Sequence, residues 1–240
     1  MSVANLSPVE NRLLAALPAK ERQRFLEGCE AVELNFSNAV YMPNEAIQHV
    51  YFPTGSCISL VAPVCDHAGL EVALVGNEGM VGIPLLLGVE FSSLQVLVQG
   101  SGSAWRMDAA SFRRELQRSS ALTAKLNHYL YVQVCQLAQT AACIRYHVVE
   151  ARLARWLLMT QDRANSNEFH VTHEFLAYML GVRRVGITKA AGSLQQKKLI
   201  SYKRGDITIV DRRGLEAASC GCYLADKQIY ERMLGKWVEE

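Results

Sequence analysis

The residues best suited to chemistry in this sequence are positively charged side chains gathered in one stretch near the C-terminus. Residues 183–213 hold nine Lys or Arg and two Asp or Glu, whereas residues 1–100 hold four basic and ten acidic residues. Guanidinium and ammonium groups bind phosphate oxygens, and a guanidinium can also grip a guanine edge through two hydrogen bonds. The asymmetry predicts a separate electropositive module with a polyanionic partner, and a solvated helix face is the simpler alternative.

Two short helices and a hairpin are predicted to position these cations. The first helix begins after Thr172, a good N-cap, and ends at Gly181, which tolerates a positive φ. A second amphipathic helix covers residues 183–196, with inward positions at Ile187, Ala190, Ala191 and Leu194. Residues 201–210 then give two strands around a basic turn with Gly205, which forms a wing. This order is typical of a winged helix-turn-helix, whose second helix enters the major groove of DNA.

The predicted contacts to double-stranded DNA divide into base-reading and phosphate-binding residues. The start of the second helix projects Arg183, Arg184, Val185 and Lys189 toward base edges. Phosphate candidates flank them at Thr172, His173, Lys203 and Arg204. The rival hypothesis is a small-molecule-binding protein whose winged helix mediates protein contacts. An enzyme is not expected, because no Ser–His–Asp spacing, Gly-rich phosphate loop or zinc-ligand cluster stands out.

A long helix is predicted before this module. Apolar residues recur at alternating intervals of four and three over about three heptads, at Leu130, Val134, Leu137, Ala141, Ile144 and Val148. This stripe predicts a dimer helix that pairs with its symmetry mate, and packing on the chain's own β domain is the alternative. A following amphipathic stretch, residues 151–159, is expected to bury Leu153, Trp156 and Leu157 and to expose Arg152 and Arg155.

The N-terminal part is predicted to be rich in β structure. After short helices within residues 6–30, segments from about Val32 to Met107 alternate with turn signals every 8–14 residues, which favours a sandwich or barrel. Residues 56–61 and 71–75 are expected to pair as a hairpin.

The 240 residues suffice for one large or two modest domains. Because no long apolar run or export signal is present, we expect a cytoplasmic protein with no membrane contact.

Other residues capable of chemistry are thiols and imidazoles. Seven cysteines, an odd and scattered number, fit reduced thiols better than a disulfide framework. Two cysteine pairs remain thiol hypotheses without an assigned role: Cys135 with Cys143 on one helix face, and Cys220 with Cys222. Four histidines are haem ligands in principle: His49, His67, His128 and His147. The simpler interpretation, free thiols and ordinary histidines, is favoured, and no metal or cofactor is predicted.

Two segments carry a resemblance to a known family. Residues 172–184 (THEFLAYMLGVRR) and 201–211 (SYKRGDITIVD), placed after a β domain and a heptad helix, resemble the Crp/Fnr family of bacterial transcription regulators. The resemblance implies an α+β fold in three parts. These are a β-roll (double-stranded β-helix) effector domain in residues 1–118, a dimerisation helix in residues 119–149 and a winged helix-turn-helix in residues 150–240.

Departures from the family pattern concern the effector and the operator. Members that bind cyclic nucleotides carry an Arg for the cyclic phosphate where this chain has Ser92-Ser93-Leu94, downstream of Gly82. An unpaired buried phosphate is costly, so tight cAMP or cGMP binding is not expected. The N-terminal cysteines of iron–sulfur members are missing, since only Cys29 lies in residues 1–56. Where family members commonly have a Glu followed by Thr or Ser, this chain has Val185 and Gly186. The operator is therefore predicted to differ from the best-known family consensus.

These observations predict a cytoplasmic homodimer that binds a two-fold symmetric operator, with half-sites about one helical turn apart. RNA polymerase is the further partner that the resemblance implies. The effector, if one exists, is left open by the sequence, as are the operator sequence and the choice between activation and repression.

Overall fold

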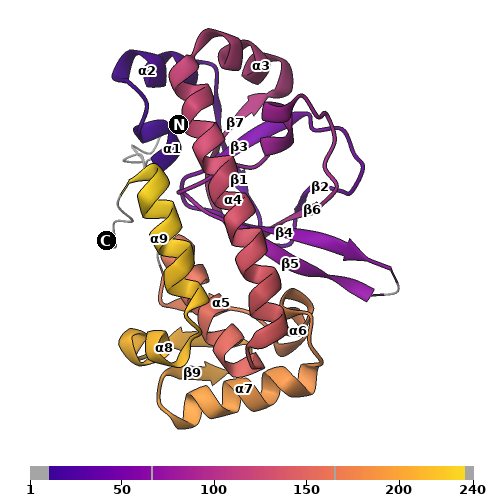
Figure 1. Ribbon diagram of the computed structural model, residues 1–240. Coiled ribbons are helices and arrows are strands. Elements are labelled where there is room, and N and C mark those ends of the chain that lie inside the picture. Colours follow the sequence, from indigo (N-terminus) through magenta and orange to yellow (C-terminus); the bar gives the residue numbers. More distant parts are fainter. Residues whose placement is uncertain (1–10, 66, 165, 236–240) are drawn as a thin grey trace, which may run out of the picture.

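The computed structural model describes residues 11–65, 67–164 and 166–235. It consists of a β-rich unit, a long central helix and a smaller helical unit that has its own three-stranded sheet (Figure 1). The predicted α+β class and the order of β-roll, long helix and winged helix are confirmed. The order follows the change in sequence period from short alternating segments to helical spacing.

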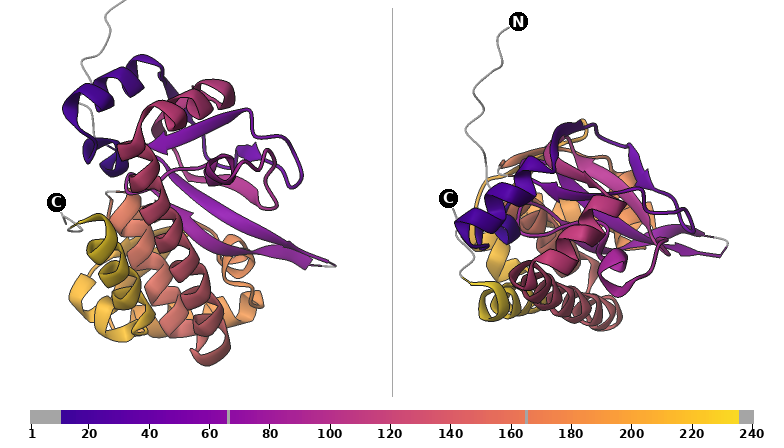
Figure 2. Two further views of the ribbon diagram at one scale, coloured as in Figure 1. Left: turned by 45° about the horizontal axis from the view of Figure 1, so that its top comes forward. Right: turned by 90° about the horizontal axis from the view of Figure 1, so that it is seen from above.

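The β-rich unit is built from two antiparallel sheets. One has the order β1 (Glu30–Leu34), β7 (Gly102–Asp108) and β3 (His49–Pro53). The other has the order β2 (Ala39–Tyr41), β6 (Gln95–Gly100), β4 (Cys57–Val64) and β5 (His67–Val75). The β4–β5 pair is the hairpin expected from residues 56–61 and 71–75. It projects outward from the body of the molecule (Figure 2), and β5 contacts the helical unit along its side.

One hydrophobic core holds the two sheets together. Phe52 of β3 and Ile58 of β4 are fully buried in it. Helices close its ends: α1 (Arg12–Ala15), α2 (Ala19–Glu27) and α3 (Ala109–Arg118), which supply Leu13, Phe25 and Phe112. The side chain of Asp108 accepts from the Ser111 amide, so it caps α3 as the sequence predicts.

The central helix α4 (Ser120–Tyr146) runs past both units, and α9 (Cys222–Leu234) lies beside it (Figures 1 and 2). Tyr230 of α9 and Val132 of α4 are buried against each other. The last helix therefore returns to the central helix. Val148, the last residue of the predicted stripe, lies beyond the end of α4. No helix of the described segments is both long and apolar enough to cross a bilayer.

The helical unit contains α5 (Val149–Ala164), β8 (Glu168–His170), α6 (His173–Leu180), α7 (Arg184–Gln196), β9 (Ile200–Lys203), β10 (Asp206–Ile209) and α8 (Arg212–Ala218). The second core joins them, with Leu153, Leu176 and Ile207 fully buried. This core reaches into the β-rich unit, because Val61 of β4 is a buried member of it and Leu97 of β6 packs against it.

The expectation that Arg152 and Arg155 face solvent is wrong. Both are buried on α5. Arg155 Nη2 donates to Asp226 Oδ2 of α9 at 2.6 Å, and Arg152 Nη2 donates to the carbonyl of Leu180 at the end of α6. A guanidinium is buried only where acceptors satisfy it, and here both acceptors come from elements far away in the chain.

Candidate nucleic-acid interface

Helices α6 and α7 meet at a tight turn. Thr172 Oγ1 accepts from the Phe175 amide at 3.1 Å and so begins α6. Gly181 ends α6 with φ of 61°, and the amides of residues 181 and 182 bond back to carbonyls of the last turn. Arg183 is extended and α7 begins at Arg184. These local features are as the sequence predicts.

The wing is a two-residue hairpin. Lys203 of β9 pairs with Asp206 of β10, and Arg204 and Gly205 form the turn with φ of 54° and 95°. Two successive positive φ values give the primed turn that matches strand twist. The predicted wing is therefore present, with Lys203 and Arg204 exposed at its tip.

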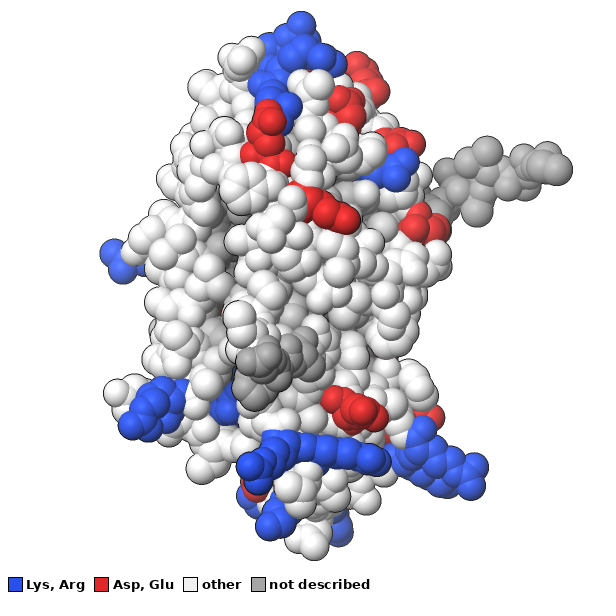
Figure 3. All heavy atoms as spheres, turned by 90° about the vertical axis from the view of Figure 1, so that its right-hand side faces the viewer, with Lys and Arg blue, Asp and Glu red and all other residues white. Residues whose placement is uncertain are grey.

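One exposed face of α7 carries the predicted base-reading residues. Arg184, Val185 and Lys189 are exposed, and so is Arg183 just before the helix. The opposite face of α7 is buried through Ile187, Ala190, Ala191 and Leu194. Lys and Arg gather at this end of the molecule in the space-filling view (Figure 3). Thr188, which sequence reasoning missed, lies one turn after Arg184 on the exposed face, and its i+4 spacing was the available signal.

The helical unit matches a known family model. The model of the Crp-like helix-turn-helix domain covers residues 151–218. These residues form a Crp-like helix-turn-helix domain. No curated protein matches the chain at a significant level.

Solved structures with this fold cover most of the chain. A protein of Eubacterium rectale, assigned to the Crp/Fnr family of transcriptional regulators, is 17% identical with a TM-score of 0.67 and covers 87% of this chain and 99% of its own. The c-di-GMP responsive global regulator CLP of Xanthomonas campestris is 16% identical, with a TM-score of 0.64 and coverages of 80% and 99%. FixK2 of Bradyrhizobium japonicum is 13% identical, with a TM-score of 0.67 and coverages of 80% and 98%. The chain therefore has the fold of Crp/Fnr regulators.

His173 lies within the Crp-like domain as a support for the wing and α7. Its ring stacks on Tyr202 with centroids 4.6 Å apart, and Nδ1 lies 3.1 Å from Thr188 Oγ1. Nε2 is buried and has no hydrogen-bond partner. Burial, followed by the nearby charge of Arg184, lowers the pKa of His173. The lowered pKa favours the neutral imidazole, which joins three elements of the Crp-like domain, while its role as a phosphate contact stays a prediction.

A cavity of about 150 Å³ lies between the β-roll and α4. It includes both positions where the sequence departs from cyclic-nucleotide binders, Gly82 and the run Ser92 to Leu94. Its other walls are mainly apolar and include Leu130, Val134 and Leu137 of α4. None of the lining residues in the described part of the chain is Lys, Arg, Asp or Glu. A cyclic phosphate placed there would find no cation, so these residues do not fit such a ligand.

Proposed function

We propose that the chain is a sequence-specific DNA-binding transcription regulator that acts in the cytoplasm as a homodimer. The proposal rests on the exposed cationic start of α7, held beside a cationic wing tip on a Crp-like helix-turn-helix. A recognition helix presents its N-terminal residues to base edges, and a wing follows the phosphate backbone. RNA polymerase is the further partner we propose, since a regulator of transcription acts on it or on its access to DNA.

The proposed dimer rests on the exposed apolar stripe of α4. Val134 of α4 is 53% exposed, and Val148, two residues past the end of the helix, is 72% exposed. Leu137 and Ala141 are exposed between them. Pairing with a second copy would bury these side chains and set two recognition helices about 34 Å apart, the pitch of one DNA turn.

Control by cAMP or cGMP is not part of the proposal. The β-roll cavity lacks a cation, and loss of one charge-assisted phosphate contact costs about 1.5–3 kcal/mol, a factor of 10 or more in affinity. Calorimetric titration with either nucleotide is expected to give no saturable heat. Micromolar binding would contradict this part of the proposal.

The DNA-binding proposal is tested with two variants of different expected behaviour. With an operator chosen from a random duplex pool, Arg184→Ala is expected to cost about 1–3 kcal/mol and to relax specificity at one base pair. Lys203→Ala is expected to weaken all duplexes alike and to reduce the slope of log K against log salt by about one. Fluorescence anisotropy over a salt series measures both.

The matched control is Lys20→Ala, which removes an exposed lysine from α2 at the far end of the molecule. Its salt slope should equal that of the wild type. If the Arg184 variant discriminates operator from scrambled duplex as well as the wild type does, the assigned role of Arg184 is wrong. A chain that leaves duplex unbound even in low salt would support the rival hypothesis, in which the winged helix mediates protein contacts.

A further inference from the structure

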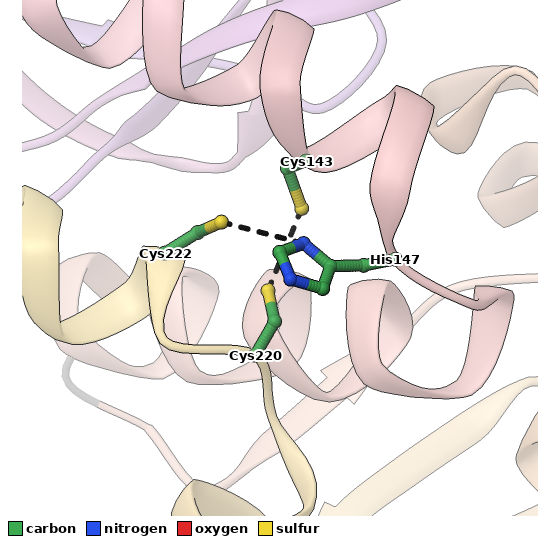
Figure 4. A group of neighbouring side chains, drawn as sticks. All are labelled: Cys143, His147, Cys220 and Cys222. Atoms are coloured by element: carbon green, nitrogen blue, oxygen red, sulfur yellow. Dashed lines mark hydrogen bonds between the residues drawn. The ribbon is translucent and has the colours of Figure 1, made fainter.

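Four side chains with metal-binding atoms converge where the central helix meets the Crp-like domain. They come from the end of α4 (Cys143 and the C-cap His147) and from the junction of α8 and α9 (Cys220 and Cys222), as Figure 4 shows. Their donor atoms all lie within 4.8 Å of one another. The sequence placed these residues in three unrelated groups, because the two halves are more than 70 residues apart.

The distances are close to those of a tetrahedral site. Cys143 Sγ lies 3.5 Å from Cys220 Sγ, and Cys222 Sγ lies 3.5 Å from His147 Nδ1. Zinc ligands at about 2.0–2.3 Å from the ion are separated from one another by roughly 3.5–3.8 Å. Two opposite edges of the ligand tetrahedron, Cys143–Cys220 and Cys222–His147, therefore already have the required length. Donor atoms that lie up to 4.8 Å apart need to move closer by about 1 Å.

The donor set selects the metal. We propose that Cys143, His147, Cys220 and Cys222 bind one Zn²⁺ ion. Thiolates and imidazole are the ligands of structural zinc sites, in which three Cys and one His fill all four positions. The three cysteines are buried and unbridged, while His147 is exposed and leaves a path from solvent. With no position open for water, the site is structural and has no catalytic role.

The surroundings suit the negative charge of such a site. Three thiolates and Zn²⁺ carry a net charge of −1, and Arg152 and Arg155 act electrostatically on Cys143. The Nε of Arg155 is buried and has no hydrogen-bond partner, so it is available to a metal-bound thiolate. Gln139 Nε2 already donates to Cys222 Sγ at 2.9 Å. Such outer donors orient metal ligands and stabilise their charge.

The site would stabilise the connection between α4 and the Crp-like domain. His147 caps α4, and α5 begins two residues later at Val149. A metal ion held there joins the end of the central helix to the junction of α8 and α9, and so fixes the direction in which the chain enters the Crp-like domain. This inference does not depend on the proposed DNA binding, because the metal is measured without DNA.

Metal analysis of the purified protein tests the site. After growth with added zinc, elemental mass spectrometry is expected to find about one zinc per chain. His147→Ala and Cys222→Ser are expected to lower the zinc content by about tenfold or more, because each removes one of four ligands. Cys135→Ser is the matched control on the same helix. Cys135 stands outside the cluster, so this variant should keep the wild-type zinc content.

A second measurement covers the case in which a variant fails to fold. Wild-type protein stripped with a chelator is titrated with Zn²⁺ against a chromophoric competitor, and one equivalent is expected to protect three thiols from alkylation and to raise Tm. Stoichiometric iron with acid-labile sulfide, a Cys143–Cys220 disulfide in place of metal, or no zinc uptake by the stripped protein would each overturn the proposal.

Discussion

Arg163 of α5 and Glu78, in the turn after β5, form an ion pair in which each side chain is only 3% exposed. Arg163 Nε donates to Glu78 Oε1 at 2.8 Å, and Glu78 Oε2 accepts from the Gly76 amide at 3.0 Å. The pair joins the β-roll to the first helix of the Crp-like domain. Both charged groups are therefore shielded from water, and each is compensated by the opposite charge of the other.

We expect Glu78→Ala to lower the free energy of unfolding by about 3–5 kcal/mol, because it leaves the Arg163 guanidinium buried without its carboxylate. Urea unfolding followed by far-UV circular dichroism measures the change. Glu90→Ala is the matched control, since Glu90 is paired with Arg113 on the surface and should cost under about 1 kcal/mol. Equal effects of the two substitutions would show that burial does not govern the Glu78 pair.

At the scale of elements, a chain of hydrogen bonds connects helix α5 to strands β6, β4 and β5. Thr160 Oγ1 of α5 donates to the carbonyl of Trp156 and accepts from Gln99 Nε2. The Gln99 oxygen therefore faces Ser59 Oγ, at 2.5 Å, and takes its hydrogen. Glu71 lies 2.6 Å on the other side of Ser59 Oγ, which has only one hydrogen to give.

When the Glu71 carboxyl is protonated, its hydroxyl donates to Ser59 Oγ, and both short contacts of Ser59 are then hydrogen bonds. Burial raises the pKa of Glu71 to about 7, although the contacts with Ser59 and Trp156 and the charges of Arg163 and Arg155 act in the opposite direction. The ordinary glutamate pKa of about 4.3 applies in the unfolded chain. The folded protein therefore binds one more proton than the unfolded chain between these two values.

The sign of the pH dependence follows from that proton. The contribution of Glu71 to stability should rise as pH falls from about 8 to about 5, by at most about 2–3 kcal/mol, because the cost of a buried carboxylate is removed. Glu71→Gln mimics the protonated form and should abolish this part of the slope. Urea unfolding at pH 5 and pH 8 measures it, with Glu33→Gln as a control at an exposed carboxylate. An unchanged slope in the Glu71 variant would contradict the assignment.

At the scale of the whole molecule, α4 presents three kinds of surface. Tyr129 and Leu126 face the β-roll core, and Val132 faces α9. Val134, Leu137 and Ala141 stay exposed in the described part of the chain, and Val134 and Leu137 also line the β-roll cavity. The surface expected to pair with a second copy thus adjoins the cavity.

We expect Val134→Glu to convert the proposed dimer into a monomer, because it would bring like charges together in an apolar seam. Sedimentation velocity over a concentration series measures the change, and operator affinity should fall because the two half-sites are no longer bound together. Ala124→Glu, at an exposed position of α4 off the stripe, is the matched control. A wild-type chain that stays monomeric at high concentration would remove the basis of this prediction.

Much of the proposed interface could be predicted from the sequence because its physics is local. The cap at Thr172, the positive φ at Gly181, the inward face of α7 and the turn at Gly205 each depend on residues within one or two turns of the chain. The heptad stripe and the pairing of β4 with β5 follow from period alone in the same way. The Crp/Fnr resemblance added the β-roll, whose turns alone indicated only a sandwich or barrel.

What the sequence determined by itself is therefore the set of elements and the cationic face of the second helix. Only the tertiary structure decided that Arg152 and Arg155 are buried and that Glu71 lies against Ser59. It alone brought Cys143 and His147 to Cys220 and Cys222. Each of these outcomes depends on partners many residues away. Spacing along one element shows which side chains share a face, but it carries no information on which distant acceptor or ligand that face will meet.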